Sequence, residues 1–476
     1  MKKISILLSM LVVPLFFSCS EDELDIKPDY LDLLNSIDSE QKMQQVLNNA
    51  YLNITSTSAF GGQALMIADL LGENMFVTSQ SSSFLITHNF QYNGLTNEFS
   101  AYGTMYDVIL YSNMVINNSI VASSENVTRI KAEAKILRAI AYFYLINSYS
   151  ANPATGLNQE FGVPLVLGDY DNSIQPARAT VAEVYAQIIA DLEDGVAGAY
   201  AAPEYKNYLS KTAAKLMLSK VYLTRRAAGD AQLALNYATD VINNSPSIFA
   251  PVVKESYVNY FNSQANNLTE NQPETIWELD LNFNNNSATG IGSNFSLPSY
   301  YQYNGSRKTF LFTQDFYNSF AATDVRKGLF TTQQVPNTDS PTGLWTTKHA
   351  RTTETGNFFR DIKILRFADA ELNRIEALYL LGDTTTALAE LNAFSQKRGG
   401  EAYSGANLLN DILTERSKEF FAEGYRFYDL KRNQMPIQRT SNCTVCTLPA
   451  NDLKFVFPVG QGSLNQNSGL VQYPGY

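Results

Sequence analysis

Paired stretches of helical periodicity constrain this chain more than any other feature of its sequence. From Ala231 to Ile242, apolar residues recur in steps of three, four and seven, which places them on one face of a helix. The segment before it, Ser210 to Arg225, is also predicted to be helical, and Gly229–Asp230 supplies a turn between the two. A second unit runs from Arg366 to Arg398 with Gly382–Asp383 at its turn. Both units are close to the period of about 34 residues of tetratricopeptide helix pairs.

Further helices are predicted at Tyr102–Ile120, Ile130–Tyr149 and Leu408–Gly424, and a short strand at Thr275–Leu281. The intervening stretches are rich in Asn, Ser, Thr, Gly and aromatic residues and show few regular patterns, and loops this long are usually functional. We therefore predict a mostly α fold. It has tetratricopeptide-like helix pairs as a scaffold, about 98–246 and 366–430, and a large loop-rich irregular lobe with short strands, about 55–98 and 247–365.

The N-terminus has the features of an export signal. Lys2 and Lys3 precede an apolar run from Ile4 to Phe17, which is too short to span a bilayer. The run ends in Phe-Phe-Ser before Cys19, which resembles a bacterial lipoprotein signal with Cys19 as the lipidated residue. An ordinary signal peptide that happens to contain a cysteine is the alternative. We expect a signal peptide at 1–18, a lipidated, acidic tether at 19–39, and a single domain at 40–476.

Charge and cysteine usage narrow the function classes. The formal net charge is −11 and no run of Lys or Arg interrupts the acidic balance, so nucleic-acid binding is not expected. Beyond Cys19, only Cys443 and Cys446 remain, spaced C-x-x-C in a loop-like context without a second pair of metal ligands nearby. We expect a disulfide that closes a small loop, or two free thiols, and no metal site.

Catalytic signatures are scarce. The chain has only two histidines, His88 and His349, which we expect at surface or loop positions, and no nucleophile elbow, zinc-protease motif or phosphate-binding loop occurs. Glu274 and Glu278, beside Trp277, form the one suggestive carboxylate cluster, and we expect Trp277 itself in the core. We predict no enzymatic activity and no cofactor.

Charged residues inside the predicted helices are expected to be structural. Arg138, Arg366 and Arg374 lie within apolar helices, which favours buried or interfacial pairing with Glu or Asp. A second group has helical spacing that allows ion pairs three or four residues apart: Glu415, Arg416, Glu419, Glu423, Arg426 and Asp429.

Several sequence blocks resemble the SusD/RagB family, and together they extend over most of the chain. The blocks are Ala132–Tyr142 followed by Phe161–Val166, Ser210–Ala214 through Val221–Leu223, Leu365–Ala377 closing at Arg398–Gly399, Glu415–Arg432, and the C-terminal Phe457–Tyr476. The block Glu415–Arg432 is the most specific, because charged and aromatic residues recur there at fixed offsets. One departure is Tyr102, where the family often has Trp.

The resemblance implies a surface-exposed, lipid-anchored protein of the outer membrane that binds a nutrient oligomer without catalysis. It also implies a partner, a SusC-like TonB-dependent transporter, on which the helical repeats would dock while the irregular lobe faces the ligand. Three classes of function compete: glycan binding leads, RagB-type oligopeptide binding is second, and a surface glycoside hydrolase is a distant third. A deep acidic cleft would favour peptides over glycans.

Aromatic side chains among amides are the candidates for ligand binding. Sugars present C–H faces and hydroxyls, so flat apolar rings with polar neighbours suit them. Trp345 is expected to be exposed. The alternative is that these rings pack the irregular lobe or face the transporter. The candidates are Phe76, Tyr92, Tyr102, Tyr300, Tyr301, Tyr303, Asn304, Arg307 and Trp345.

Overall fold

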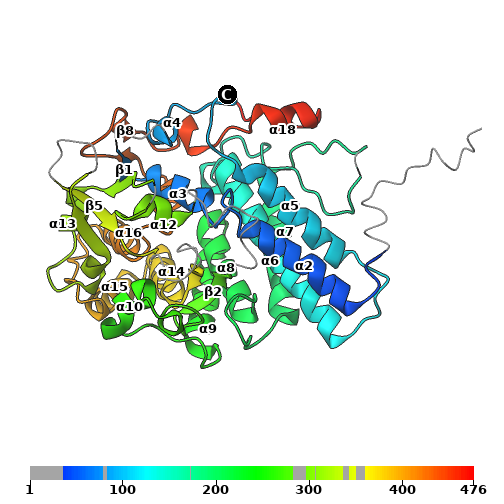
Figure 1. Cartoon of the computed structure of the whole chain (residues 1–476), viewed down its shortest axis with the longest axis horizontal. Coiled ribbons are helices and arrows are strands. Elements are labelled where there is room, and N and C mark those ends of the chain that lie inside the picture. The colour runs from blue at the N-terminus through cyan, green and yellow to red at the C-terminus, as the bar shows by residue number, and fades with distance from the viewer. Residues whose placement is uncertain are drawn as a thin grey trace, which may run out of the picture.

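Consecutive helices packed side by side form one large part of the molecule (Figure 1). The computed structural model describes residues 36–78, 83–171, 173–281, 296–305, 307–335, 342–349 and 360–476. The predicted signal peptide at 1–18, Cys19 and most of the tether lie outside these residues. The long helices are α2 (Glu40–Ile54), α5 (Ala101–Ile116), α6 (Glu125–Tyr149), α7 (Val181–Gly198), α8 (Lys211–Arg225), α9 (Asp230–Asn244), α14 (Phe367–Leu380), α15 (Thr384–Lys397) and α16 (Leu408–Glu419).

The two predicted helix pairs are present. α8 packs on α9, α14 packs on α15, and α9 also packs on α14, so the two pairs are neighbours although about 120 residues separate them in the chain. Each turn contains a glycine in the left-handed region, with φ of 88° at Gly229 and 85° at Gly382. The mostly helical, tetratricopeptide-like fold predicted from the sequence is therefore confirmed. Among the helices described, none has the length and apolar character needed to cross a membrane.

Short strands and helices make up the rest. The largest sheet is antiparallel with the order β1-β3-β5-β4, made of Met75–Val77, Phe310–Phe312, Gly343–Thr346 and Phe330–Gln333. Two-stranded sheets join β2 (Thr275–Leu279) to β6 (Ile362–Arg366) and β7 (Ile437–Gln438) to β8 (Thr447–Leu448). The short helices are α3 (Gln63–Leu70), α4 (Leu85–His88), α10 (Tyr257–Asn262), α12 (Leu297–Tyr301), α13 (Gln314–Asn318), α17 (Arg426–Arg432) and α18 (Gln461–Gln466), and the 3₁₀ helices are η2 (Pro153–Thr155), η3 (Lys254–Ser256), η4 (Asn266–Leu268), η6 (Val325–Leu329) and η7 (Leu453–Phe455).

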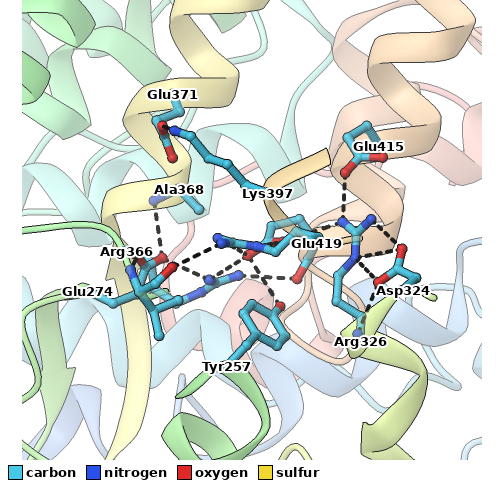
Figure 2. A network of polar contacts seen from close by, with 12 residues as sticks. Tyr257, Glu274, Asp324, Arg326, Arg366, Ala368, Glu371, Lys397, Glu415 and Glu419 are labelled. Carbon is cyan, nitrogen blue, oxygen red and sulfur yellow. Dashed lines mark hydrogen bonds and ion pairs between the residues drawn. The ribbon is translucent and has the colours of Figure 1, made fainter. Parts of the chain in front are cut away.

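A buried ion network joins the helix pairs to the sheet region (Figure 2). Glu419, the last residue of α16, is fully buried and accepts hydrogen bonds from Arg366 (2.8 Å), Arg398 (3.1 Å) and Arg326 (3.4 Å). Arg366 ends β6, Arg398 follows α15, and Arg326 lies in η6. One carboxylate thus ties three separate parts of the chain together.

The predicted helix at Leu408–Gly424 is too long. α16 ends at Glu419, and Ala422 (φ 60°) and Gly424 (φ 78°) then turn the chain in the left-handed region before α17 begins. A side chain at Gly424 would lie 2.9 Å from the Cα of Leu65, so α3 packs directly against this turn. The helical spacing in the sequence therefore continues beyond Glu419, where tertiary packing ends the helix.

The charged residues of the block Glu415–Arg432 pair mostly with distant elements and not along one helix. Glu415 pairs with Arg326, and Arg426 pairs with Glu73. Arg432–Asp429 is a pair spaced three residues apart, whereas Arg416 crosses from α16 to Asp429 in α17. The structural role expected for them is confirmed, but the pairing along a single helix is mostly wrong.

Candidate functional site

A small pocket opens between the loop after α2, the start of α3, the start of α5, and α12. Its volume is about 70 Å³, and it is lined by Thr57, Ser58, Gln63, Met66, Phe84, Ser100 and Tyr300. Figure 1 places α3, α12 and β1 together in the part of the molecule beside the four-stranded sheet. The lining contains hydroxyls, one amide, two aromatic rings and no charged side chain.

The polar side of the pocket is held by hydrogen bonds between side chains. The Ser58 hydroxyl lies 2.8 Å from the Thr104 hydroxyl in α5 and 3.0 Å from the Ser56 hydroxyl. Gln63, the first residue of α3, accepts at Oε1 from the backbone N–H of Ser100 (3.4 Å) and from its hydroxyl. These bonds fix the starts of two helices against each other and leave small hydroxyls and an amide on the pocket wall.

The aromatic side is a stack that reaches into the core. The Tyr300 ring stacks on Phe310 of β3 at 4.9 Å between centroids, and Phe84 meets Tyr300 edge to face at 5.5 Å. Burial raises the pKa of Tyr300, and the nearby Arg307 guanidinium opposes this only in part. Tyr300 therefore stays neutral at physiological pH and presents an uncharged ring to the pocket.

Phe84 is held in an unusual backbone conformation. Its φ of 63° lies in the left-handed region, which a bulky aromatic residue rarely adopts and which costs on the order of 1–3 kcal/mol. The Glu98 carboxylate fixes it by accepting from the Phe84 N–H (2.6 Å), the Thr87 N–H (3.2 Å) and the Thr87 hydroxyl (2.7 Å). Local strain that the surroundings maintain beside a pocket is typical of a binding site.

A second aromatic cluster lies on the face of the same sheet that points away from the main core. Phe76 of β1 pairs with Leu311 of β3, and Trp345 of β5 lies on this face, with Tyr303 at 5.9 Å from its ring. Phe76 and Tyr303 are half-buried, whereas Asn304 and Arg307 are exposed. The structure therefore brings together three of the predicted residues, Phe76, Tyr303 and Trp345.

Three other predicted residues are in the core. Tyr92 is buried, donates to the backbone carbonyl of Lys454, and packs on Phe99 at 4.7 Å. Tyr102 packs between Tyr106 and Tyr149, at 5.0 and 4.9 Å. Tyr301 donates to Asp69 at 2.6 Å. From these positions the three rings support the fold around the pocket and do not face solvent.

Two expectations about exposure are wrong. Trp345 is completely buried, because Leu311 and Val335 pack against it and Phe76 and Tyr303 cover the cluster. His88 is also buried, with Nε2 at 2.9 Å from the Asn442 carbonyl, and burial lowers its pKa to about 4. Trp277, expected in the core, is fully buried.

The carboxylate cluster around Trp277 is part of the structural network. Glu274 is buried, accepts from Arg366 (3.1 Å) and from the backbone N–H groups of Val252 (2.9 Å) and Ala368 (3.2 Å), and burial raises its pKa to about 7. Glu274 does not line the pocket.

Cys443 and Cys446 form a disulfide. Across the described ranges, no group of His, Cys, Asp or Glu is arranged to hold a metal ion.

The sequence reasoning missed most of the pocket. Ser58, Gln63 and Ser100 come from segments that read as irregular and polar, and no motif distinguishes them from other such residues. Phe84 lies within the predicted loop-rich lobe, but its left-handed backbone has no local signal. The pocket forms only when α3, α5 and α12 come together, which single-segment patterns do not encode.

The sequence matches family models of known proteins over most of its length. Residues 22–223 match a family model described as "Starch-binding associating with outer membrane", and residues 323–476 match the model of the SusD family. The chain belongs to the SusD/RagB family. A SusD-like protein of Bacteroides ovatus is 27% identical over 380 residues, 72% of this chain and 66% of that relative, so the chain matches less than two thirds of the relative's length.

Solved structures share the SusD/RagB fold. A SusD superfamily protein of Bacteroides thetaiotaomicron superposes with a TM-score of 0.81 at 24% identity, covering 92% of this chain and 100% of the other. Surface glycan-binding protein A of Bacteroides uniformis superposes with a TM-score of 0.72 at 19% identity, covering 91% and 99%. At these identities the likeness establishes the fold.

The blocks that resemble the SusD/RagB family lie mainly at buried joints and not at the pocket. In α6, Arg138 forms a bidentate ion pair with Asp191 of α7, at 2.8 and 2.7 Å. The block Glu415–Arg432 supplies Glu419 to the ion network described above. The blocks that carry the family resemblance and the lining of the pocket therefore consist of different residues.

Proposed function

We propose that this protein binds an oligosaccharide at the cell surface and passes it to a SusC-like TonB-dependent transporter, without chemical change. The pocket formed by Ser58, Gln63, Ser100, Phe84 and Tyr300 would take part of the glycan. The exposed Asn304 and Arg307, which follow α12 in the chain, would extend the contact, whereas Phe76 and Tyr303 lie on the other face of the sheet. The lipid on Cys19 would hold the protein on the outer membrane.

One observation carries the proposal: the pocket is uncharged, with aromatic rings on one side and hydroxyl and amide groups on the other. Neutral sugars offer C–H faces to rings and hydroxyls to such polar groups. A peptide-binding cleft of the acidic kind would need carboxylates on its wall, and Glu98, the nearest one described above, is already occupied by Phe84 and Thr87. The glycan is therefore favoured over the oligopeptide.

The comparisons support the same class. The matching family model carries the description "Starch-binding associating with outer membrane", and one structural neighbour is a surface glycan-binding protein. The helix pairs would form the docking surface for the transporter. Membrane attachment and transfer to the transporter rest on the family and are part of the proposal.

The test is thermal unfolding of residues 20–476 with a panel of plant, host and microbial oligosaccharides and with mixed peptides. A ligand at about 100 times its Kd should add about 2.7 kcal/mol of stability, a measurable rise in Tm. Gln63→Ala and Tyr300→Ala are expected to remove the rise for the glycan that binds. Gln63→Ala is the milder variant, because it leaves the aromatic stack intact.

Tyr205→Ala serves as the matched control, because Tyr205 is exposed on a loop away from the pocket and its loss should leave the rise unchanged. Stabilisation by peptides alone, lost in Tyr300→Ala, would contradict the glycan assignment and support oligopeptide uptake through the pocket. Consumption of any glycan by the purified protein, abolished by substitution of one carboxylate, would contradict the absence of catalysis.

A further inference from the structure

A larger groove runs along the other part of α5. Its volume is about 360 Å³, and it lies between α5, at Tyr106, Leu110 and Asn113, and the extended segment Leu165–Asp171 with Ile174. That size is within the range of sites that hold small ligands or side chains of a bound chain. None of the residues that line the glycan pocket belongs to it. We call it the α5 groove.

Side chains of α5 hold the opposite wall in place. Tyr106 donates to the Pro164 carbonyl at 3.0 Å, Asn113 donates to the carbonyls of Val166 (2.8 Å) and Gly168 (3.2 Å), and Asn117 donates to the Leu167 carbonyl at 3.0 Å. These four carbonyls of the wall thus have hydrogen-bond partners without a neighbouring strand. A wall fixed in this way is pre-organised, which reduces the entropy lost when a partner binds.

The side chains along the groove are unusually accessible for their type. Leu167 is 36% exposed, Tyr170 is 50% exposed, and Ile174 is 61% exposed. All three line the groove together with the half-buried Leu110 and Leu165. Adjacent exposed apolar side chains rimmed by polar groups mark a surface that another molecule covers.

The charge of the groove has one sign. Asp107, Asp169 and Asp171 line it, and no Lys or Arg is among the residues that form it. Asp107 is exposed at the groove, and partial desolvation there raises the pKa of its carboxyl. A cationic group brought to this place would stabilise the carboxylates, and the chain as a whole is acidic, with a net charge of −11.

From the aliphatic floor and acidic rim together, we propose that the α5 groove binds a polypeptide segment that carries alternating apolar and Lys or Arg side chains. The chemistry of the lining favours a sugar at the uncharged, aromatic pocket, and the same comparison favours a peptide at the aliphatic, acidic α5 groove. Aliphatic Leu and Ile side chains lack the flat ring faces that sugars need, and the carboxylates match ammonium and guanidinium groups. An anionic membrane surface would be repelled by the same rim. The inference is independent of the glycan pocket.

The probe is a short, fluorescein-labelled peptide of alternating leucine and lysine, with leucine–glutamate and serine–lysine peptides of the same length for comparison. Anisotropy is measured on residues 20–476. Only the leucine–lysine peptide is expected to bind. Leu167→Asn and Ile174→Asn should each weaken binding about tenfold by removing apolar contact, and Asp169→Asn should weaken it several-fold. These residues are exposed, so the variants should fold.

Leu381→Asn and Glu401→Gln are the matched controls, since both residues are exposed far from the groove in the α14–α15 turn and in the loop after α15. Equal loss of binding in the controls, equal binding of the serine–lysine peptide, or no binding at all would overturn the proposal. So would binding of neutral oligosaccharides, or of phosphatidylglycerol vesicles, that Leu167→Asn abolishes.

Discussion

Asp69 is a buried carboxylate in the last turn of α3, where Ala64 to Ala68 and Leu70 are buried apolar residues. It accepts from the Tyr301 hydroxyl at 2.6 Å and the Gly424 N–H at 3.0 Å, and burial raises its pKa to about 7. The two hydrogen bonds and Lys348 oppose this rise, and Glu423 adds to it. Asp69 therefore connects α3 to α12 and to the turn before α17. Its carboxyl group becomes charged as the pH rises through about 7, so this connection depends on pH.

The raised pKa predicts the sign of a pH effect. Because the folded state holds the Asp69 proton more tightly than the unfolded state, stability falls as pH rises from about 4 to about 7 and is flat above. Asp69→Asn should remove about 2.5 kcal/mol of the difference in unfolding free energy between pH 5 and pH 8, because only the part of the shift between pH 5 and about pH 7 lies in this interval. Urea titrations of both proteins at the two pH values measure it.

Glu133, Glu274 and Glu278, whose pKa values burial raises to about 7, add to the same decline in the unsubstituted protein, so only the difference between variant and parent isolates Asp69. The exposed Asp194→Asn in α7 is the control and should keep the whole decline. If Asp69→Asn kept it too, the pKa of Asp69 would not be raised in the folded protein.

The pairing of single charged residues was predictable from sequence where the charge lies in an apolar segment, although Arg366, expected inside a helix, ends the strand β6. Arg138, Arg366 and Arg374 were expected to pair with acids, and they do, with Asp191, with Glu419 and with Glu390. Candidate ligand residues were less predictable, because an aromatic ring in an irregular segment has the same local pattern whether it is buried or exposed. Trp345 and Tyr301 are such rings.

At the scale of elements, the end of α16 is the most sensitive point. Burial alone would raise the pKa of Glu419, but the guanidiniums of Arg398, Arg366 and Arg326 hold it well below its usual range. Glu419→Gln leaves these buried cations undercompensated, so we expect a loss of about 3–5 kcal/mol of unfolding free energy. Chemical denaturation monitored by circular dichroism measures the loss.

Glu390→Gln in α15 is the matched change, because Glu390 pairs with Arg374 where both side chains are partly exposed, and it should cost less than about 1 kcal/mol. Similar losses in the two variants would mean that the network around Glu419 contributes no more than a surface ion pair.

Helices were predictable as elements and the main sheet was not. Apolar periodicity over a dozen or more residues identified both helix pairs, whose ends agree with the structure to within a few residues. The strands of the four-stranded sheet are three or four residues long and pair across large separations, as Met75–Val77 does with Phe310–Phe312. Nothing in such short segments specifies the partner, so only Thr275–Leu279 was found.

At the scale of the molecule, the helix pairs and the sheet share one core. The inner face of the sheet, with Phe310, Phe312 and Leu344, belongs to the same buried cluster as residues of α6 and α8. Phe421, after α16, stacks on Phe330 of β4 at 4.8 Å and meets Phe312 edge to face at 5.5 Å. The ion network around Glu419 crosses the same boundary.

This continuity predicts one cooperative unfolding transition for the whole of the folded chain. The sequence has two tryptophans, and they report on different parts: Trp277 lies in β2 against the helices, and Trp345 lies in β5 of the four-stranded sheet. Trp277→Phe and Trp345→Phe each leave one reporter. Within each variant, the urea midpoint from fluorescence should equal that from circular dichroism, because neither part keeps its core when the other unfolds. A lower fluorescence midpoint for the variant that retains Trp345 would show instead that the sheet opens separately, as an independent ligand-binding lobe would.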